Sequence, residues 1–273
     1  MIAGAPRPQF AAATATAVPS GAFLLGYPSQ WLGFQYPVPR PLEFGRNGSF
    51  AAFRILQQDV VGFEKYLDAI AAATTLDKEL IAAKLCGRWR NGVPLVLSPN
   101  SPSPQPPLAP GKLNDFDFTK DPQGLVCPFD SHIRRTNPRG EAVAGADSDR
   151  HPIVRRGMPY GPTLNSAQDD GVDRGIIGLF LCSDLRRQVY TLTDWIKQND
   201  FSPVYDANRR VQDPLVGNRA VPGVEATFIV PGANGATTVR GLPDFVHTKG
   251  TVFLLYPSRT TLQALSSSPA SGA

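Results

Sequence analysis

Residues 88–166 are so rich in proline, glycine, asparagine and aspartate that their pattern predicts an irregular segment. Irregular stretches of this length are uncommon inside compact domains and often carry function. The segment also divides the chain, because the regular hydrophobic patterns lie before and after it. The sequence therefore predicts two blocks of secondary structure, with the functional residues in the segment that joins them.

The first block has the order strand, helix, helix. Residues 49–56 have the pattern of a strand. Asp59 is predicted to cap a helix, since a side-chain oxygen at that position satisfies a free backbone N–H. A second short helix is expected over residues 76–85. The apolar stripe of the first helix consists of Val60, Phe63, Leu67 and Ile70.

The second block begins at residues 176–182, a continuous apolar run typical of a buried strand. Ser183 or Asp184 is expected to cap the helix that follows, whose apolar stripe continues to Ile196. Strands are expected at residues 226–230 and 251–256, with the turn residues Asn234 and Gly235 between them. This order predicts an α+β fold in which helices pack on an antiparallel sheet.

The domain boundaries follow from composition. Residues 1–45 are expected to form an extended N-terminal segment, residues 46–265 the folded domain and residues 266–273 a disordered tail. Hydrophobic residues make up 42% of the chain and charged residues 18%, as in globular proteins. No apolar run reaches the roughly 18 residues that a membrane span needs. The N-terminus lacks a secretory signal pattern. A cytoplasmic location is the default expectation, and an extracellular one applies if the N-terminus is truncated.

The formal net charge is +4, and much of it lies in residues 134–156. Such a segment suits either nucleic acid or a small partner that carries carboxylates. Few aromatic residues are interspersed with these arginines, so base stacking has little support. The charge pattern therefore favours an anionic small molecule, and neither nucleic acid nor a membrane is expected as a partner.

The histidines restrict the metal chemistry. None of the three has a second histidine at the spacing of a zinc site. A single histidine suffices as the axial ligand of a haem iron. The chain also has no G-x-S-x-G, P-loop or dinucleotide-binding motif. Its histidines are His132, His151 and His247, and its three widely spaced cysteines, predicted to be buried thiols, are Cys86, Cys127 and Cys182.

The sequence around His132 is the most distinctive in the chain. Residues 127–139 read C-P-F-D-S-H-I-R-R-T-N-P-R, and residues 155–161 read R-R-G-M-P-Y-G. These stretches resemble the central motifs of dye-decolorizing peroxidases. Shorter segments resemble the same family in the same order, so the resemblance covers residues 21–265. They lie at 21–27, 46–50, 58–60, 87–89, 174–182 and 213–217.

The resemblance implies a ferredoxin-like fold, one haem b per chain, and a peroxidase that uses hydrogen peroxide to oxidise dyes, phenols or other bulky donors. His132 matches the family's proximal iron ligand, and Arg155 matches its distal arginine. Asp213 is expected to hold the proximal imidazole, with Asp200 as the competing residue.

Other site residues follow from the same resemblance. Phe180 or Leu181 is expected in the apolar roof over the haem, and their alternation along a strand leaves the choice open. Three arginines are expected to pair with the haem propionates, since guanidinium groups suit carboxylates. The alternative for these arginines is a solvated basic face. They are Arg134, Arg135 and Arg139.

One family motif has no match in this chain. Family members carry G-x-x-D-G upstream of the segment that matches residues 21–27, and residues 1–20 contain no aspartate. We therefore expect the N-terminal half of the usual protein, with its distal aspartate, to be absent and any activity to be weak. A haem-binding homologue without turnover is the alternative function, and a basic nucleic-acid module rests on charge alone. The sequence leaves a homo-oligomer open.

Overall fold

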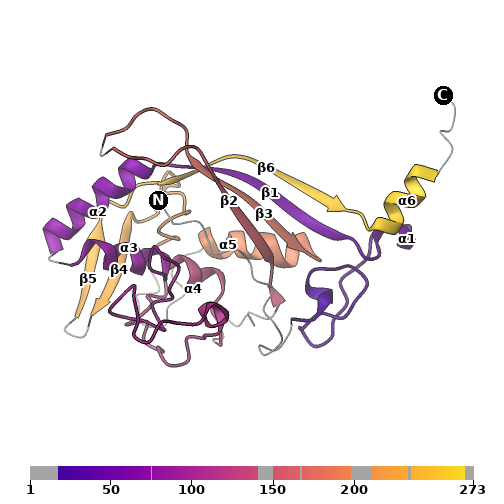
Figure 1. The fold of residues 1–273 in the computed structure, drawn as a ribbon, viewed down its shortest axis with the longest axis horizontal. Helices are drawn as coiled ribbons and strands as arrows, with labels where there is room; N and C mark the ends of the chain where they lie inside the picture. The colour runs from indigo at the N-terminus through magenta and orange to yellow at the C-terminus, as the bar shows by residue number, and fades with distance from the viewer. Residues whose placement is uncertain are drawn as a thin grey trace.

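The computed structural model describes residues 18–74, 76–140, 150–166, 168–197, 211–232 and 235–267. Within these ranges, a four-stranded sheet has the order β2-β3-β1-β6, and each neighbouring pair is antiparallel (Figure 1). The strands are β1 (Ser49–Gln58), β2 (Val154–Tyr160), β3 (Gly175–Cys182) and β6 (Val246–Tyr256).

Numbered by their order in the chain, the strands of this sheet run 2-3-1-4 from edge to edge. The helix α2 (Val60–Thr74) follows the first strand, and α5 (Thr191–Lys197) follows the third. The elements of this sheet thus follow the order β-α-β-β-α-β. With this strand arrangement, that order defines the ferredoxin-like fold. The predicted α+β class with an antiparallel sheet is confirmed.

β2 is a strand that the sequence pattern did not predict. It lies inside the segment expected to be irregular, and six of its seven residues are exposed. An exposed strand shows no alternation of apolar and polar residues, so its sequence carries no strand signal. Pairing with β3 along the whole strand gives it its conformation.

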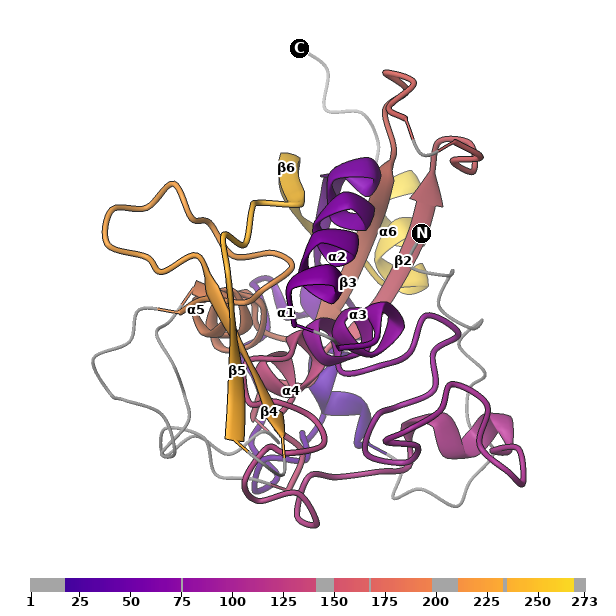
Figure 2. The same cartoon turned by 90° about the vertical axis from the view of Figure 1, so that its left-hand side faces the viewer.

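The two strands expected near the C-terminus are present, and they belong to different sheets. Residues 226–230 fall largely in β4 (Thr227–Gly232), which pairs with β5 (Gly235–Arg240) as a separate two-stranded sheet. Residues 251–256 belong to β6 in the main sheet. Figure 2 shows the β4–β5 hairpin standing apart from the main sheet. The predicted turn residue Asn234 lies outside the described residues.

The predicted helix caps are confirmed. Asp59 Oδ1 accepts a 2.7 Å hydrogen bond from the Gly62 N–H at the start of α2. Asp184 accepts from the Arg187 N–H. The segment that Asp184 caps is a π-helix, η4 (Leu185–Tyr190), which continues into α5. The remaining elements are η1 (Ser20–Ala22), α1 (Leu42–Gly45), α3 (Lys78–Cys86), η2 (Pro110–Asn114), α4 (His132–Thr136) and α6 (Arg259–Ser267).

Parts of the segments expected outside the folded domain contribute to the structure. Within the expected N-terminal segment, Ala22, Leu25 and Tyr36 are buried. At the other end, α6 continues to Ser267, and residues 1–17 and 268–273 lie outside the described ranges. None of the helices in the described part of the chain has the length and hydrophobicity that crossing a bilayer requires.

The helices cover one face of the main sheet. On that face Ala52 and Cys182 pack with Val189 of η4. Figure 1 shows α3, α4 and α5 on this side of the sheet. The opposite face is open at β6, where Val252 is 46% exposed and Leu254 is 38% exposed. The side chains that organise the functional site therefore lie between the sheet and the helices.

A second core joins α2 and α3 to the β4–β5 hairpin. Burial of apolar side chains there fixes α3 in the fold, because each removes apolar surface from water. The fully or nearly fully buried members include Leu67, Ile81, Leu85, Phe228 and Phe245.

Gly87 ends α3 and lets this helix pack closely on α4. Its φ is 92°, and a Cβ at this position would lie 2.3 Å from Ile133 Cγ1. We expect Gly87→Ala to lower the free energy of unfolding by about 2 kcal/mol or more, because both the positive φ and the contact oppose a side chain. Chemical denaturation measures this change.

Gly250→Ala is the matched control for that variant. Gly250 lies in β6 with no atom within 4 Å of the position of a Cβ. Its replacement should change the free energy of unfolding by less than about 1 kcal/mol. Equal destabilisation by both substitutions would contradict the role given to Gly87.

Candidate functional site

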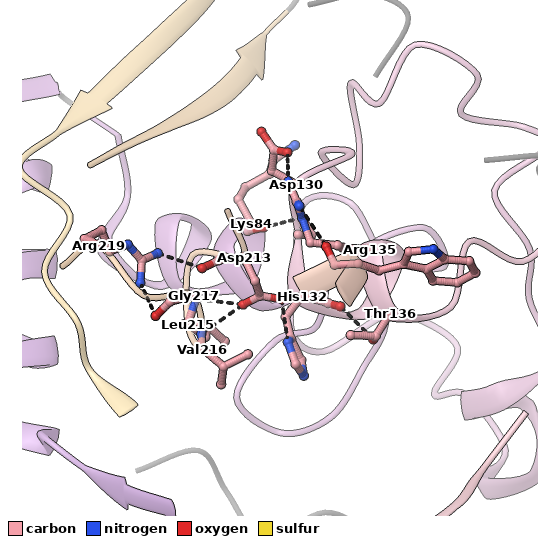
Figure 3. Close-up of polar contacts among 12 residues, drawn as sticks. Lys84, Asp130, His132, Arg135, Thr136, Asp213, Leu215, Val216, Gly217 and Arg219 are labelled. Carbon is pink, nitrogen blue, oxygen red and sulfur yellow. Dashed lines mark hydrogen bonds and ion pairs between the residues drawn. The ribbon is translucent and has the colours of Figure 1, made fainter. Parts of the chain in front are cut away.

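The site centres on the imidazole of His132, the first residue of α4. Its Nδ1 lies 2.8 Å from Asp213 Oδ2, and its side chain is 22% exposed. A carboxylate accepts hydrogen bonds, so this contact assigns the ring proton to Nδ1. Among the described residues, Nε2 has no hydrogen-bonding partner, and its lone pair is therefore available to an electrophile. Figure 3 shows the ring extending away from Asp213.

Asp213 is fixed from several directions and is fully buried. Its Oδ1 accepts hydrogen bonds from the Leu215 N–H at 2.9 Å and the Val216 N–H at 3.0 Å. Its backbone carbonyl accepts from Arg219 Nη2 at 2.6 Å (Figure 3). These contacts leave the carboxylate one orientation, in which Oδ2 meets the imidazole.

The electrostatics of Asp213 favour its charged form. Burial opposes ionisation, but the interactions with His132, the charge of Arg135 and the N–H of Val216 outweigh burial and lower the pKa of Asp213. An ionised carboxylate bonded to Nδ1 increases the electron density at the other ring nitrogen. The pair therefore forms an oriented, electron-rich nitrogen donor.

The two arginines after His132 are internal. Arg135 is 0% exposed and donates through Nη2 to Asp130 Oδ1 at 2.6 Å and through Nη1 to the carbonyl of Trp195 at 3.0 Å. Arg134 is 1% exposed and donates to Asp121 Oδ2 at 2.9 Å. Both pairs attach α4 to the surrounding loops, and so they fix the position of the imidazole.

This geometry disfavours two of the expected propionate partners. Arg134 and Arg135 were expected either to bind propionates or to form a solvated basic face, but their guanidinium groups are buried in ion pairs. A buried cation that already has a carboxylate partner gains little from a second one. Arg139 differs, because it is partly exposed and, among the described residues, its side chain donates only to the carbonyl of Asn114.

The sheet separates the two residues proposed for the haem roof. Phe180 lies directly opposite Arg155 in the β2–β3 pair, whereas Leu181 lies opposite Val154. Successive side chains point to opposite faces of a strand. Phe180 packs with the helix-facing cluster of Ala52, Cys182 and Val189. Arg155 and Phe180 therefore share the helix-facing side, and Leu181 points to the other.

Next to this pair, both strands carry glycine. Gly157 lies opposite Gly178, two residues along each strand from Arg155 and Phe180 and therefore on the same face of the sheet. At Gly178 a Cβ would lie 2.7 Å from the Phe180 ring, so that ring extends over the glycine. On the side that β2 and β3 turn toward the helices, the Phe180 ring therefore covers Gly178, and Arg155 lies opposite Phe180.

Cys86 is the last residue of α3. Burial raises the pKa of its thiol, and a backbone hydrogen bond with Arg88 and the charges of Arg155 and Arg88 oppose this shift.

For two residues near the site, Lys84 and Arg88, the sequence analysis predicted no individual role. Lys84 is buried in α3 and donates to the carbonyls of Leu125 and Val126 at 2.7 and 2.6 Å, which holds the loop before His132. A lysine in an amphipathic helix gives no sign of such a role. Arg88 was noted only as part of a short motif. Asp200, the competitor of Asp213, lies outside the described residues.

The chain is similar to known peroxidases. It is 30% identical over 247 residues to a dye-decolorizing peroxidase of Exidia glandulosa, covering 84% of this chain and 48% of that protein. An ancestral D-type dye-decolorizing peroxidase structure matches with a TM-score of 0.74 and 28% identity, covering 90% of this chain and 56% of that one. The structure of a dye-decolorizing peroxidase in complex with 2,6-dimethoxyphenol matches with a TM-score of 0.71 and 27% identity. This match covers 96% of this chain and 61% of that one. No protein-family model matches.

The matches cover only part of the relatives. The chain spans about half the length of the curated relatives it matches, for example 48% of the Exidia protein. The similarity therefore concerns the region that contains His132, Asp213 and Arg155.

The buried pair of Arg135 and Asp130 is open to a direct test. We expect Arg135→Met to lower the free energy of unfolding by about 3–5 kcal/mol, because it leaves the carboxylate of Asp130 buried without its cation. As a control, Arg187→Met removes an exposed pair with Asp184 and should cost less than about 1 kcal/mol. Thermal and chemical unfolding measure the stability of both variants. An Arg135→Met protein as stable as the unmodified chain would contradict the structural role of the Arg135–Asp130 pair.

Proposed function

Because the chain belongs to the dye-decolorizing peroxidase family, we propose that it binds one haem b through His132 and reduces hydrogen peroxide with electrons from bulky donors. The observation that carries this proposal is the contact of 2.8 Å between His132 Nδ1 and Asp213 Oδ2. It leaves Nε2 as an oriented donor that would hold the haem iron.

The residues present suit this cofactor. A single imidazole with a carboxylate on its far nitrogen matches the donor set of a haem protein rather than that of a zinc site. The helix-facing side of β2 and β3 suits a planar ring, since Gly157 adds no side chain to it and the Phe180 ring lies over Gly178. When bound, haem supplies an iron at which peroxide is reduced.

Arg155 is proposed to stabilise charge on the peroxide. A guanidinium at this position would stabilise negative charge on a bound peroxide. In the complete reaction, one hydrogen peroxide and two phenol molecules, each of which gives up one electron and one proton, would yield two waters and two phenoxyl radicals. Phenols fit the donor class, because a structural neighbour binds 2,6-dimethoxyphenol.

Haem binding without turnover is the second candidate function. A peroxidase must also move a proton from the near to the far oxygen of peroxide, and an arginine is a poor base. On the helix-facing side of the four main-sheet strands, the register places no Asp, Glu or His. This observation favours a chain that holds the cofactor and turns peroxide over slowly.

The first test of the proposal removes the ligand. We expect His132→Ala to abolish the Soret band of the purified, haem-loaded protein, and added imidazole to restore part of it. Absorption spectra after gel filtration provide the measurement. The control is His247→Ala, because His247 is exposed on β6 and should leave the band intact. A wild-type Soret band in His132→Ala would place the iron ligand elsewhere.

A second test concerns the residue that orients the ligand. Asp213→Asn keeps the shape of the side chain but removes the charge at Nδ1, so we expect haem affinity to fall about ten- to a hundredfold. The iron reduction potential should rise, because the imidazole donates less electron density. Asp170→Asn, at an ion pair between an exposed aspartate and the buried Arg174, should change neither quantity. An unchanged potential in Asp213→Asn would rule out this orienting role.

Turnover separates the two candidate functions. The haem-loaded chain is mixed with hydrogen peroxide and 2,6-dimethoxyphenol, and oxidation of the phenol is followed optically. Steady oxidation that disappears in His132→Ala supports the peroxidase. Full haem occupancy with no oxidation above that of free haem supports binding without turnover.

A further inference from the structure

The side of the main sheet that points away from the helices is almost entirely apolar. Successive side chains of a strand point to opposite faces, so the neighbours of the helix-facing Ala52, Arg155 and Phe180 lie on this other side. The register aligns them in three rows that each cross all four strands from β2 to β6. We call this surface the outer face. Its rows are Val154, Leu181, Ala51 and Leu254; Arg156, Leu179, Phe53 and Val252; and Met158, Ile177, Ile55 and Gly250.

The outer face is open to solvent in the part of the chain that the structure describes. Both edge strands and the central strand β1 contribute exposed apolar side chains to it, and its other large side chains are half-buried. Four strands about 4.8 Å apart and about 25 Å long span roughly 500 Å². Soluble monomers seldom expose a contiguous apolar patch of this size, so the surface indicates a partner. The exposed members are Val154, Met158, Ile55, Val252 and Leu254.

Charge lies only at the rim of the outer face. Every position that β1 and β3 contribute to the three rows is apolar. Arg156 is the single charged residue in the rows, and it lies on the edge strand β2, where a long side chain can extend into water. Covering the face with protein therefore removes apolar surface from water without burying a charge. An apolar centre inside a polar rim is the composition of interfaces in homodimers.

A second copy of this chain fits the outer face best. Sheets that pack face to face keep their strands within about 30° of each other when their twists agree, and two copies have the same twist. The other sheet of the described chain is the β4–β5 hairpin, which is too narrow to cover four strands. Its side chains Phe228, Val230 and Val239 are already buried in the second core. Among the described sheets, only the outer face of another copy matches this surface, which gives a two-fold symmetric contact.

The area of the outer face agrees with that of a stable dimer. Side chains that stand out of a sheet make its accessible surface larger than its flat area, so two outer faces would together bury roughly 1,200 Å² or more. Specific and stable protein interfaces begin at about this size. The face is therefore large enough to hold two copies together without a contribution from other surfaces.

We propose that two copies of this chain associate through their outer faces, sheet against sheet, around a two-fold axis. The helices lie on the other side of each sheet, so every copy keeps its own candidate site directed away from the contact (Figure 1). This inference goes beyond the proposed function and does not depend on haem binding, because His132, Asp213 and Arg155 all lie outside the outer face.

The test measures the mass of the full chain in solution. Sedimentation equilibrium of the unmodified chain over a wide range of concentrations should show monomers in equilibrium with dimers. Ile55→Lys places a charge on the central strand β1 at a side chain that is exposed in the single chain. It should leave the fold intact and weaken the dimer at least about a hundredfold. Val252→Lys, on the edge strand β6, should weaken the dimer about tenfold, because its ammonium group can reach water.

Val221→Lys is the matched control. It makes the same substitution at an exposed valine outside the strands, and it should leave the affinity between copies unchanged. Circular dichroism and chemical denaturation, at a concentration at which every variant is monomeric, check that each one is folded. Haem uptake is measured separately, since His132→Ala should abolish the Soret band and keep the dimer.

The oligomeric state of each variant decides the outcome. A dimer that is lost in Ile55→Lys and weakened in Val252→Lys but kept in Val221→Lys supports the inference, whether or not the chain binds haem. An unmodified chain that sediments as a monomer at every concentration overturns it, and binding of anilinonaphthalene sulfonate then shows whether the outer face is free for a different partner. A dimer that persists in both folded outer-face variants is formed by another surface, and the inference is wrong.

Discussion

The hydrogen bond between His132 Nδ1 and Asp213 Oδ2 determines the chemistry of this chain, because it gives the imidazole one tautomer and one orientation. It joins segments 81 residues apart, so it exists only if both are fixed independently. Backbone N–H groups and Arg219 fix Asp213. The ion pair of Arg135 with Asp130 helps to fix the helix that begins at His132. Burying such a pair costs desolvation, and its benefit here is a defined position for the nitrogen donor.

The arginines divide into two groups by their partners. Arg134 and Arg135 are buried against carboxylates and organise the loops around α4. Arg88 and Arg139 lie against carbonyls and an aromatic ring, which orient a guanidinium without neutralising it. The difference decides which of them can still attract an anion, and residue type alone does not show it. A basic sequence segment can thus contain both the framework of a site and its binding groups.

The sequence predicted the parts of the fold that depend on local patterns. The strand β1, the helix α2 and the Asp59 and Asp184 caps each follow from signals within a few residues. It missed β2, whose exposed residues show no alternation, and it did not identify β5 as the partner of residues 226–230, because strand partners depend on long-range packing. At the site, His132 and Asp213 were named from a resemblance, and their contact came only with the fold.

What the sequence determined by itself is the inventory: two histidines, His132 and His151, among arginines in an irregular segment, flanked by blocks that build an antiparallel sheet with helices. Only the tertiary structure decided the partners of those groups. It put Phe180 and not Leu181 on the face with Arg155, and it gave Arg134 and Arg135 internal carboxylates, whereas Arg88 has none among the residues that the structure describes. The physical reason is that charge pairing and burial depend on distances between segments remote in the chain, which local sequence patterns do not encode.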